Sequence, residues 1–99
     1  FTSDRNRILF RTRAELSWNC QDVARNSCNI TTSFLLPRVN EPNPSFVIER
    51  GRPARGSITI SPERGTIYTL TCRGLDNSTV SRQLTIRVLG AVIEEVTPR

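Results

Sequence analysis

Hydrophobic side chains recur at every second position along much of the chain, which is the pattern of strands with one buried face. The clearest case is "GTIYTLTCRG" at residues 65–74. There Tyr68, Leu70 and Cys72 share one side, and the two residues between them, Thr69 and Thr71, point to the other side. This segment predicts a strand whose Tyr, Leu and Cys side chains point into a core.

Two further segments alternate in the same way. "AELSWNC" puts Ala14, Leu16, Trp18 and Cys20 on one face. "VSRQLTIRVLG" puts on one face Val80, Arg82, Leu84, Ile86 and Val88, and we expect Arg82 near the open end of this strand. Together the alternating segments predict a core whose main side chains are Leu16, Trp18, Tyr68, Leu70, Leu84 and Ile86.

Shorter apolar segments separated by turn signals complete the pattern. The segment "PRVNEPNPS" at residues 37–45 has three prolines and predicts an exposed loop, and "GRPARG" at residues 51–56 predicts a turn. The remaining expected strands are "RILFRT", "SCNITTSFLL", "FVIER" and "SITIS". About seven short strands with frequent turns predict an all-β fold, a β-sandwich formed by residues 1–99 as a single domain.

The charge of the chain is unusual in kind, because all 14 cations are arginine and the net charge is +5. A positive balance favours anionic partners such as acidic polysaccharide or nucleic acid. On alternating strands most arginines are expected at outward, solvated positions. The alternative is a basic patch assembled by folding, for which Arg50, Arg52 and Arg55 are the candidate anion-binding residues.

The sequence offers little for catalysis. The 99 residues include no histidine, so neither a Ser-His nor a Cys-His nucleophile pair can be built. The carboxylates are scattered, a glycine-rich phosphate loop is absent, and no C-x-x-C motif supports a zinc site. We therefore expect a protein that is not an enzyme and has no cofactor or metal. Two acceptor sequons, "NIT" at Asn29 and "NST" at Asn77, are candidate glycosylation sites.

A family resemblance covers residues 14–89. "AELSWNCQDVARNSCNIT" and, after an insertion, "GSITISPERGTIYTLTCRGLDNSTVSRQLTIRVLG" resemble the immunoglobulin-like modules of bacterial secreted and cell-surface proteins. The most specific matches are "LSW" at residues 16–18, Cys28, and "YTLTC" at residues 68–72. The chain departs from the family pattern at Cys20 and in a longer central region, so residues 37–55 are interpreted as an inserted loop or edge region.

The resemblance bears on the three cysteines, which permit three different single bridges. Closing the loop from Cys28 to Cys72 restricts the unfolded chain by about 4 kcal/mol, against about 2.6 kcal/mol for Cys20 with Cys28. The resemblance also favours a Cys28–Cys72 disulfide, with Cys20 left as a buried thiol beside Trp18, inert because an apolar setting disfavours its thiolate. It further implies that the Tyr68 hydroxyl donates to a backbone group and closes a corner between strands.

The function that the resemblance implies is that of a structural or adhesive module of an extracellular or cell-surface protein. No segment approaches the roughly 20 apolar residues of a transmembrane span. Residues 1–12 and 90–99 both carry strand-like apolar groups outside the matched region, so we expect one or both to contact neighbouring domains or identical subunits. The alternatives are that both segments pack within their own domain, and that the module instead binds an acidic glycan or nucleic acid through its arginines.

Overall fold

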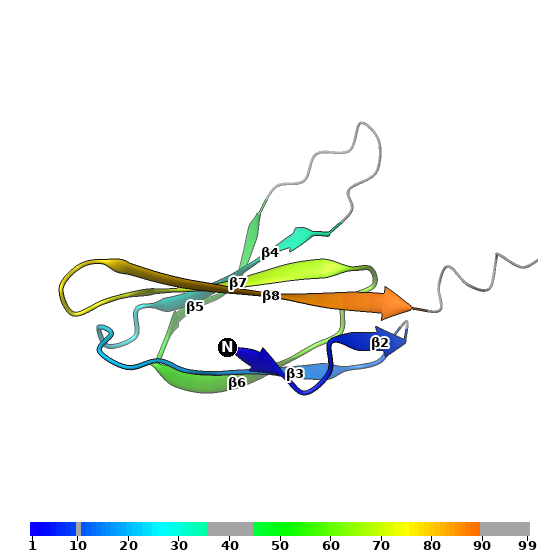
Figure 1. Cartoon of the computed structure of the whole chain (residues 1–99), viewed down its shortest axis with the longest axis horizontal. Helices are drawn as coiled ribbons and strands as arrows, with labels where there is room; N and C mark the ends of the chain where they lie inside the picture. The colour runs from blue at the N-terminus through cyan, green and yellow to red at the C-terminus, as the bar shows by residue number, and fades with distance from the viewer. Residues whose placement is uncertain (10, 36–44, 90–99) are drawn as a thin grey trace, which may run out of the picture.

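The computed structural model describes residues 1–9, 11–35 and 45–89, and these residues form eight strands and no helix (Figure 1). The predicted all-β class is confirmed, with eight strands where about seven were predicted. The strands are β1 (Thr2–Ser3), β2 (Arg7–Leu9), β3 (Ala14–Asn19), β4 (Cys28–Phe34), β5 (Phe46–Arg52), β6 (Arg55–Ile60), β7 (Thr66–Arg73) and β8 (Thr79–Leu89).

The strands form two open sheets that lie as two layers in Figure 1. One sheet has the order β1-β3-β6, and the other has the order β2-β8-β7-β4-β5. The paired strands run antiparallel except for β2, which runs parallel to β8. Strands β5 and β6 end their respective sheets and are joined by Pro53 and Ala54 alone, so the two sheet edges meet on this side of the molecule.

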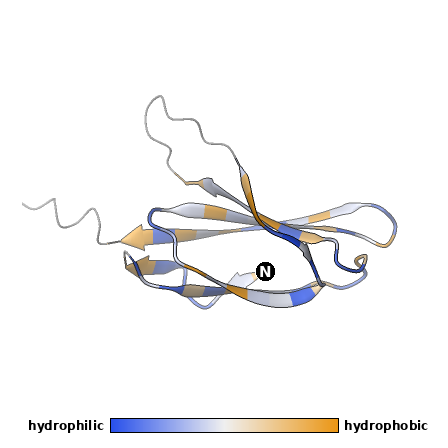
Figure 2. Cartoon of the chain, turned by 180° about the vertical axis from the view of Figure 1, so that it is seen from behind, coloured by the Kyte–Doolittle hydropathy of each residue, from blue (hydrophilic) through white to orange (hydrophobic). Residues whose placement is uncertain are grey.

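The alternating residues of both sheets meet in one core. Apolar and polar bands alternate along the strands in Figure 2, as the period of two requires. Five of the six predicted core residues are buried, and the sixth, Leu84, is half-buried against the same cluster. The buried apolar residues are Ile8, Ala14, Leu16, Trp18, Cys28, Ile30, Ile60, Tyr68, Leu70, Cys72 and Ile86.

The first nine residues belong to the domain's own sheets. β1 pairs with β3 in one sheet and β2 pairs with β8 in the other, so the chain changes sheet between them. Ile8 is 3% exposed and is part of the core, whereas Leu9 at the end of β2 is exposed. The N-terminal segment therefore pairs within its own domain as far as Leu9. Thr12 also bonds within the domain, to Leu9 and Ser61. Phe10 and residues 90–99, on which the contact prediction also falls, lie outside the described residues.

The region around Gly51 differs from the prediction. The expected strand at residues 46–50 continues to Arg52, and the expected turn at residues 51–56 contributes to both β5 and β6. Gly51 has φ 61°, a left-handed conformation that glycine adopts without steric cost, and its N–H donates to Asn29 Oδ1 at 3.0 Å. The pairing of β4 with β5 also shifts register, so the strand continues through an irregularity where the sequence predicted a turn.

Candidate functional site

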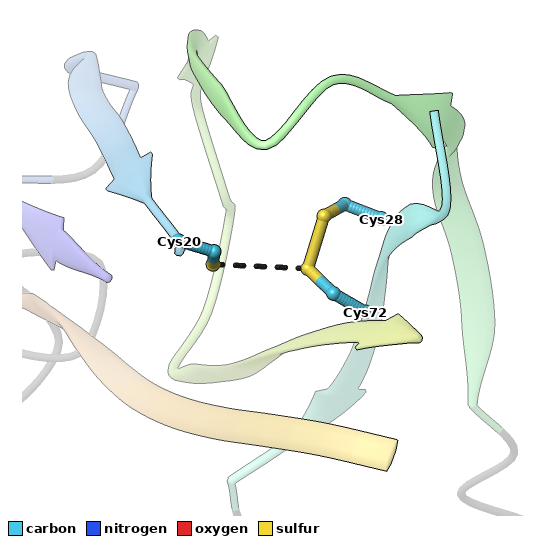
Figure 3. Close-up of side chains that lie close together, drawn as sticks. All are labelled: Cys20, Cys28 and Cys72. Carbon is cyan, nitrogen blue, oxygen red and sulfur yellow. Dashed lines mark hydrogen bonds between the residues drawn. A yellow bond between two sulfur atoms is a disulfide. The ribbon is translucent and has the colours of Figure 1, made fainter. Parts of the chain in front are cut away.

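The three cysteines come together at one end of the core (Figure 3). Cys28 begins β4 and Cys72 lies near the end of β7, and the register of these strands places the two residues opposite each other. Their sulfur atoms are at disulfide-bonding distance, which is the pair that the sequence predicted. The bond joins neighbouring strands of one sheet, and both residues are buried, with 0% and 1% of their surface exposed.

Cys20 is the third member of this cluster and comes from the other sheet. It follows the last residue of β3, and its Sγ lies 3.8 Å from Sγ of Cys72 (Figure 3). Because Cys72 in a disulfide carries no proton, the Cys20 thiol is the donor in this contact. Cys20, predicted as a buried thiol, packs against the core but is only half-buried. It follows a strand end, where one side of the residue is open to solvent.

The cluster is better suited to thiol–disulfide chemistry than to binding a metal ion. All three Sγ atoms lie within 4.8 Å of one another. While Cys28 and Cys72 are joined as a disulfide they supply no thiolate, so the cluster then has one free thiol, fewer ligands than the four of a structural zinc site.

The arginines proposed as an anion site are not equivalent. Arg52 is half-buried, and its guanidinium lies 5.5 Å from the centre of the Trp18 ring. Its Nη1 lies 3.4 Å from Glu49 Oε1, and its Nη2 donates to the backbone oxygen of Ser57 at 3.3 Å. Three contacts hold this guanidinium to its own domain. The stacked guanidinium and the aliphatic part of the Arg52 side chain therefore cover the edge of the core.

Arg50 and Arg55 are both exposed, on β5 and β6 respectively. They occupy the two sheet edges that meet at Pro53 and Ala54. Of the three predicted anion-binding residues, these two present their charge to solvent, and Arg52 serves the packing around Trp18.

Tyr68 lies in the core, but the predicted corner bond is not found. Its hydroxyl has no hydrogen-bond partner among the described residues. Tyr68 instead lines an open groove together with Phe34, Ile48 and Ile60. The Arg64 guanidinium lies 3.5 Å from the centre of the Phe34 ring in this groove. Burial raises the pKa of Tyr68 from 10.0 to about 12, because the phenolate would lose its hydration.

The two sequons also differ in setting. Asn29 lies within β4, between β5 and β7, and its side-chain oxygen accepts the Gly51 N–H. Asn77 is exposed in the turn between β7 and β8, with φ 68°, a left-handed conformation that asparagine tolerates. Asn77 is therefore the more exposed of the two sequons.

Sequence reasoning missed a run of exposed apolar side chains on β5. Phe46, Val47 and Ile48 stand in succession on β5 and are 56%, 41% and 39% exposed. Successive strand residues point to opposite faces, so apolar groups cover both faces of this edge strand. The signal in the sequence is the unbroken triplet "FVI", which departs from the alternation of the half-buried strands.

Among the described residues, no helix is long and apolar enough to cross a membrane. Comparison of the chain with models of protein families, with curated proteins and with solved structures finds no match in any of the three.

Proposed function

We propose that this chain is a non-enzymatic, immunoglobulin-like structural or adhesive module of an extracytoplasmic surface protein or filament. It acts by holding an apolar sheet edge rigidly against a neighbouring subunit. A cysteine pair at disulfide distance supports the location, since disulfides persist in oxidising compartments.

The sheet order supports the immunoglobulin-like interpretation. In such sandwiches the second and fifth strands share one sheet, and the third, sixth and seventh share the other, with an added strand beside the third in variable-type domains. Here β3 and β6 share the smaller sheet, and β4, β7 and β8 share the larger one. Strand β5 beside β4 then corresponds to the added edge strand. The disulfide differs, because it lies within one sheet where antibody domains link the two.

The observation that carries the contact function is the exposure of Phe46, Val47 and Ile48 on β5. β5 ends the larger sheet, so its outer backbone edge faces away from its partner β4. An edge strand with apolar side chains is a template for pairing with another strand, and natural proteins usually protect such edges. This edge is suited to a partner that adds a strand and covers the apolar side chains.

The occupant we propose is the segment of residues 90–99 from a second copy of the chain. This segment carries Val92, Ile93 and Val96 around the acidic pair Glu94 and Glu95. The apolar side chains match the exposed side chains of β5, and the carboxylates complement the exposed Arg50 and Arg55. Copies joined in this way would associate head to tail, which builds rings or filaments.

The alternative function, capture of an acidic glycan or nucleic acid, rests on the arginines. Its support is narrower, because the guanidinium of Arg52 is engaged by Trp18, Glu49 and Ser57. Of the three candidate residues, Arg50 and Arg55 remain as exposed cations, and two neighbouring charges give weak, salt-sensitive attraction to a polyanion.

Light scattering across a range of protein concentrations tests the proposal. The full chain should associate, and both deletion of residues 91–99 and Val47→Lys should shift it toward the monomer. A lysine in the middle of an edge strand opposes pairing through its charge and its hydration. Leu75→Lys is the matched control, because Leu75 is 69% exposed in the turn after β7, away from β5.

Two results would overturn the proposal. One is a full chain that stays monomeric at the highest concentration reached. The other is association that Val47→Lys leaves unchanged while Leu75→Lys abolishes it, which would move the interface to the opposite turn.

A further inference from the structure

The half-buried thiol of Cys20 faces a disulfide that solvent does not reach. Cys28 and Cys72 are 0% and 1% exposed, so a thiol in solution has no direct path to either sulfur. Cys20 Sγ lies 3.8 Å from Sγ of Cys72, inside the domain (Figure 3). Exchange between thiols and disulfides requires access of the attacking sulfur, which must approach along the axis of the bond that breaks. All three Sγ atoms lie within 4.8 Å of one another, so Cys20 Sγ lies beside the Cys28–Cys72 bond, and rotation of the Cys20 side chain has to bring it onto that axis.

Backbone contacts hold Cys20 in this place. Its N–H donates to the Ala54 oxygen at 2.8 Å, which anchors it to the connection between β5 and β6. Four residues later, the N–H of Ala24 donates to the Arg73 oxygen at 2.7 Å, and Val23 forms a bridge with Gly74. The segment that carries Cys20 is thus tied at one end to the β5–β6 connection and at the other to the residue that follows Cys72. These backbone contacts keep Sγ of Cys20 close to Sγ of Cys72 in the folded domain.

We propose that Cys20 and the Cys28–Cys72 pair form an internal thiol–disulfide exchange site with two interconverting isomers. The Cys20 thiolate attacks Sγ of Cys72, a bond forms between these two sulfurs, and the bond from Cys72 to Cys28 breaks. The electron pair of that bond goes to Sγ of Cys28, which takes up the proton that Cys20 released. One disulfide and one thiol are present before and after, so no external oxidant or reductant is consumed.

The isomers differ in which strands are linked. In the described isomer the disulfide staples β4 to β7 within the larger sheet. In the second isomer it ties the end of β3 to β7, and so links the two sheets. The sequence separation changes from 44 to 52 residues, and loop closure depends only weakly on length, so chain entropy favours neither isomer strongly.

The isomers also differ in which thiol is free. The described isomer leaves Cys20, which is half-buried and open to reagents, whereas the second leaves Cys28, which is fully buried. The exchange therefore decides whether the molecule presents a reactive thiol near its surface. Such a thiol is the group that forms mixed disulfides with other molecules.

Disulfide mapping on the folded protein tests this directly. The protein is incubated at about pH 9, where free thiols are substantially ionised, then quenched with acid, blocked with N-ethylmaleimide and digested without reduction. We expect peptides that link Cys20 to Cys72 beside those that link Cys28 to Cys72. A sample scrambled in urea should in addition give the Cys20–Cys28 peptide, which marks exchange in the unfolded chain.

Two variants sharpen the test. Cys20→Ala should keep only the Cys28–Cys72 bond at every pH, and Cys28→Ala should form the Cys20–Cys72 bond on mild oxidation without denaturant. If Cys28→Ala fails to fold, the time course of the wild-type protein alone decides. A wild-type protein that shows only Cys28–Cys72 after prolonged incubation at about pH 9 overturns the proposal. So does the appearance of Cys20–Cys28 in the folded protein as fast as Cys20–Cys72.

Discussion

The indole ring of Trp18 lies against the α-carbon of Gly56, its direct partner across the pairing of β3 with β6. A Cβ atom added to Gly56 would lie 2.7 Å from Cζ2 of the ring. The ring also donates from Nε1 to the Pro53 oxygen at 2.9 Å and is covered by the Arg52 guanidinium. The largest side chain of the core is therefore held in one position from three directions, and the absence of a side chain at Gly56 makes that position available.

Replacement of Gly56 by alanine should destabilise the domain. The added methyl group collides with a ring that its hydrogen bond and its stacking hold in place, so the expected loss is about 1–3 kcal/mol in the free energy of unfolding. Denaturant unfolding followed by the fluorescence of the single tryptophan measures it. Ser57→Ala, an exposed neighbour on β6, should change stability by no more than about 0.5 kcal/mol. Equal losses in both variants would contradict this account of the contact.

Arg50 and Arg52 should respond differently to alanine, although they lie two residues apart. Arg52→Ala removes the stacking on Trp18 and the cover that its stem provides, at a cost of about 1 kcal/mol in stability. Arg50→Ala leaves stability nearly unchanged, because its side chain is exposed. Parallel denaturant curves for the two variants make the comparison.

The exposed residues Arg50 and Arg55 should bind heparin weakly and without specificity. We expect a dissociation constant no tighter than micromolar at physiological salt, with Arg50→Ala and Arg55→Ala together weakening it further. Isothermal titration at two salt concentrations measures this. Submicromolar binding that these substitutions abolish would favour the polyanion-binding alternative over the structural function.

The sequons should differ when the protein is made in a host that glycosylates. Asn77 is exposed in a turn and should carry a glycan, whereas the half-buried Asn29 lies within β4 and its side-chain oxygen already accepts the Gly51 N–H. Intact mass should fall by one glycan in Asn77→Gln and stay unchanged in Asn29→Gln. A glycan found at Asn29 would mean that β4 is open in the secretory pathway.

Much of the fold follows from the alternation of side chains. β3 and β7 were predictable because each buries every second residue over six or more positions. β8 was predictable from the same alternation of apolar residues, although only Ile86 in it is fully buried. β1 has two residues, too few for a period to appear. β5 was predicted to stop at Gly51, because glycine and the nearby Pro53 are turn signals. The structure shows why β5 continues: Gly51 adopts a positive φ, and its N–H bonds to the Asn29 side chain of the neighbouring strand β4. This pairing cannot be read from the sequence of β5.

The sites depend more on pairing than on pattern. That Cys28 and Cys72 face each other follows from the register of β4 with β7, which no local sequence signal contains. The contact of Cys20 with Cys72 and that of Trp18 with Gly56 join different strands in the same way. The exposed side chains of β5 could be found in the sequence as an apolar triplet, but its position at a sheet edge could not.

Tyr68 should make stability depend on alkaline pH. Burial raises its pKa in the folded protein to about 12, while the unfolded chain has the ordinary value of 10.0. The folded state therefore favours the protonated phenol. Its contribution is fully present below pH 10 and is lost as the pH rises from there toward 12, because the unfolded chain releases its proton first. The two-unit difference corresponds to a loss of up to about 2–3 kcal/mol across that window.

The measurement is simple because Tyr68 is the only tyrosine of the chain. Ultraviolet absorbance of the phenolate should show its titration near pH 12 in the folded protein and near pH 10 in urea. In Tyr68→Phe this pH dependence should vanish. Its stability at neutral pH should change little, because the hydroxyl has no hydrogen-bond partner among the described residues. A folded-state titration at the ordinary pKa would show that the hydroxyl is hydrated in the groove beside Phe34 and Ile48, and would remove the basis for the predicted loss.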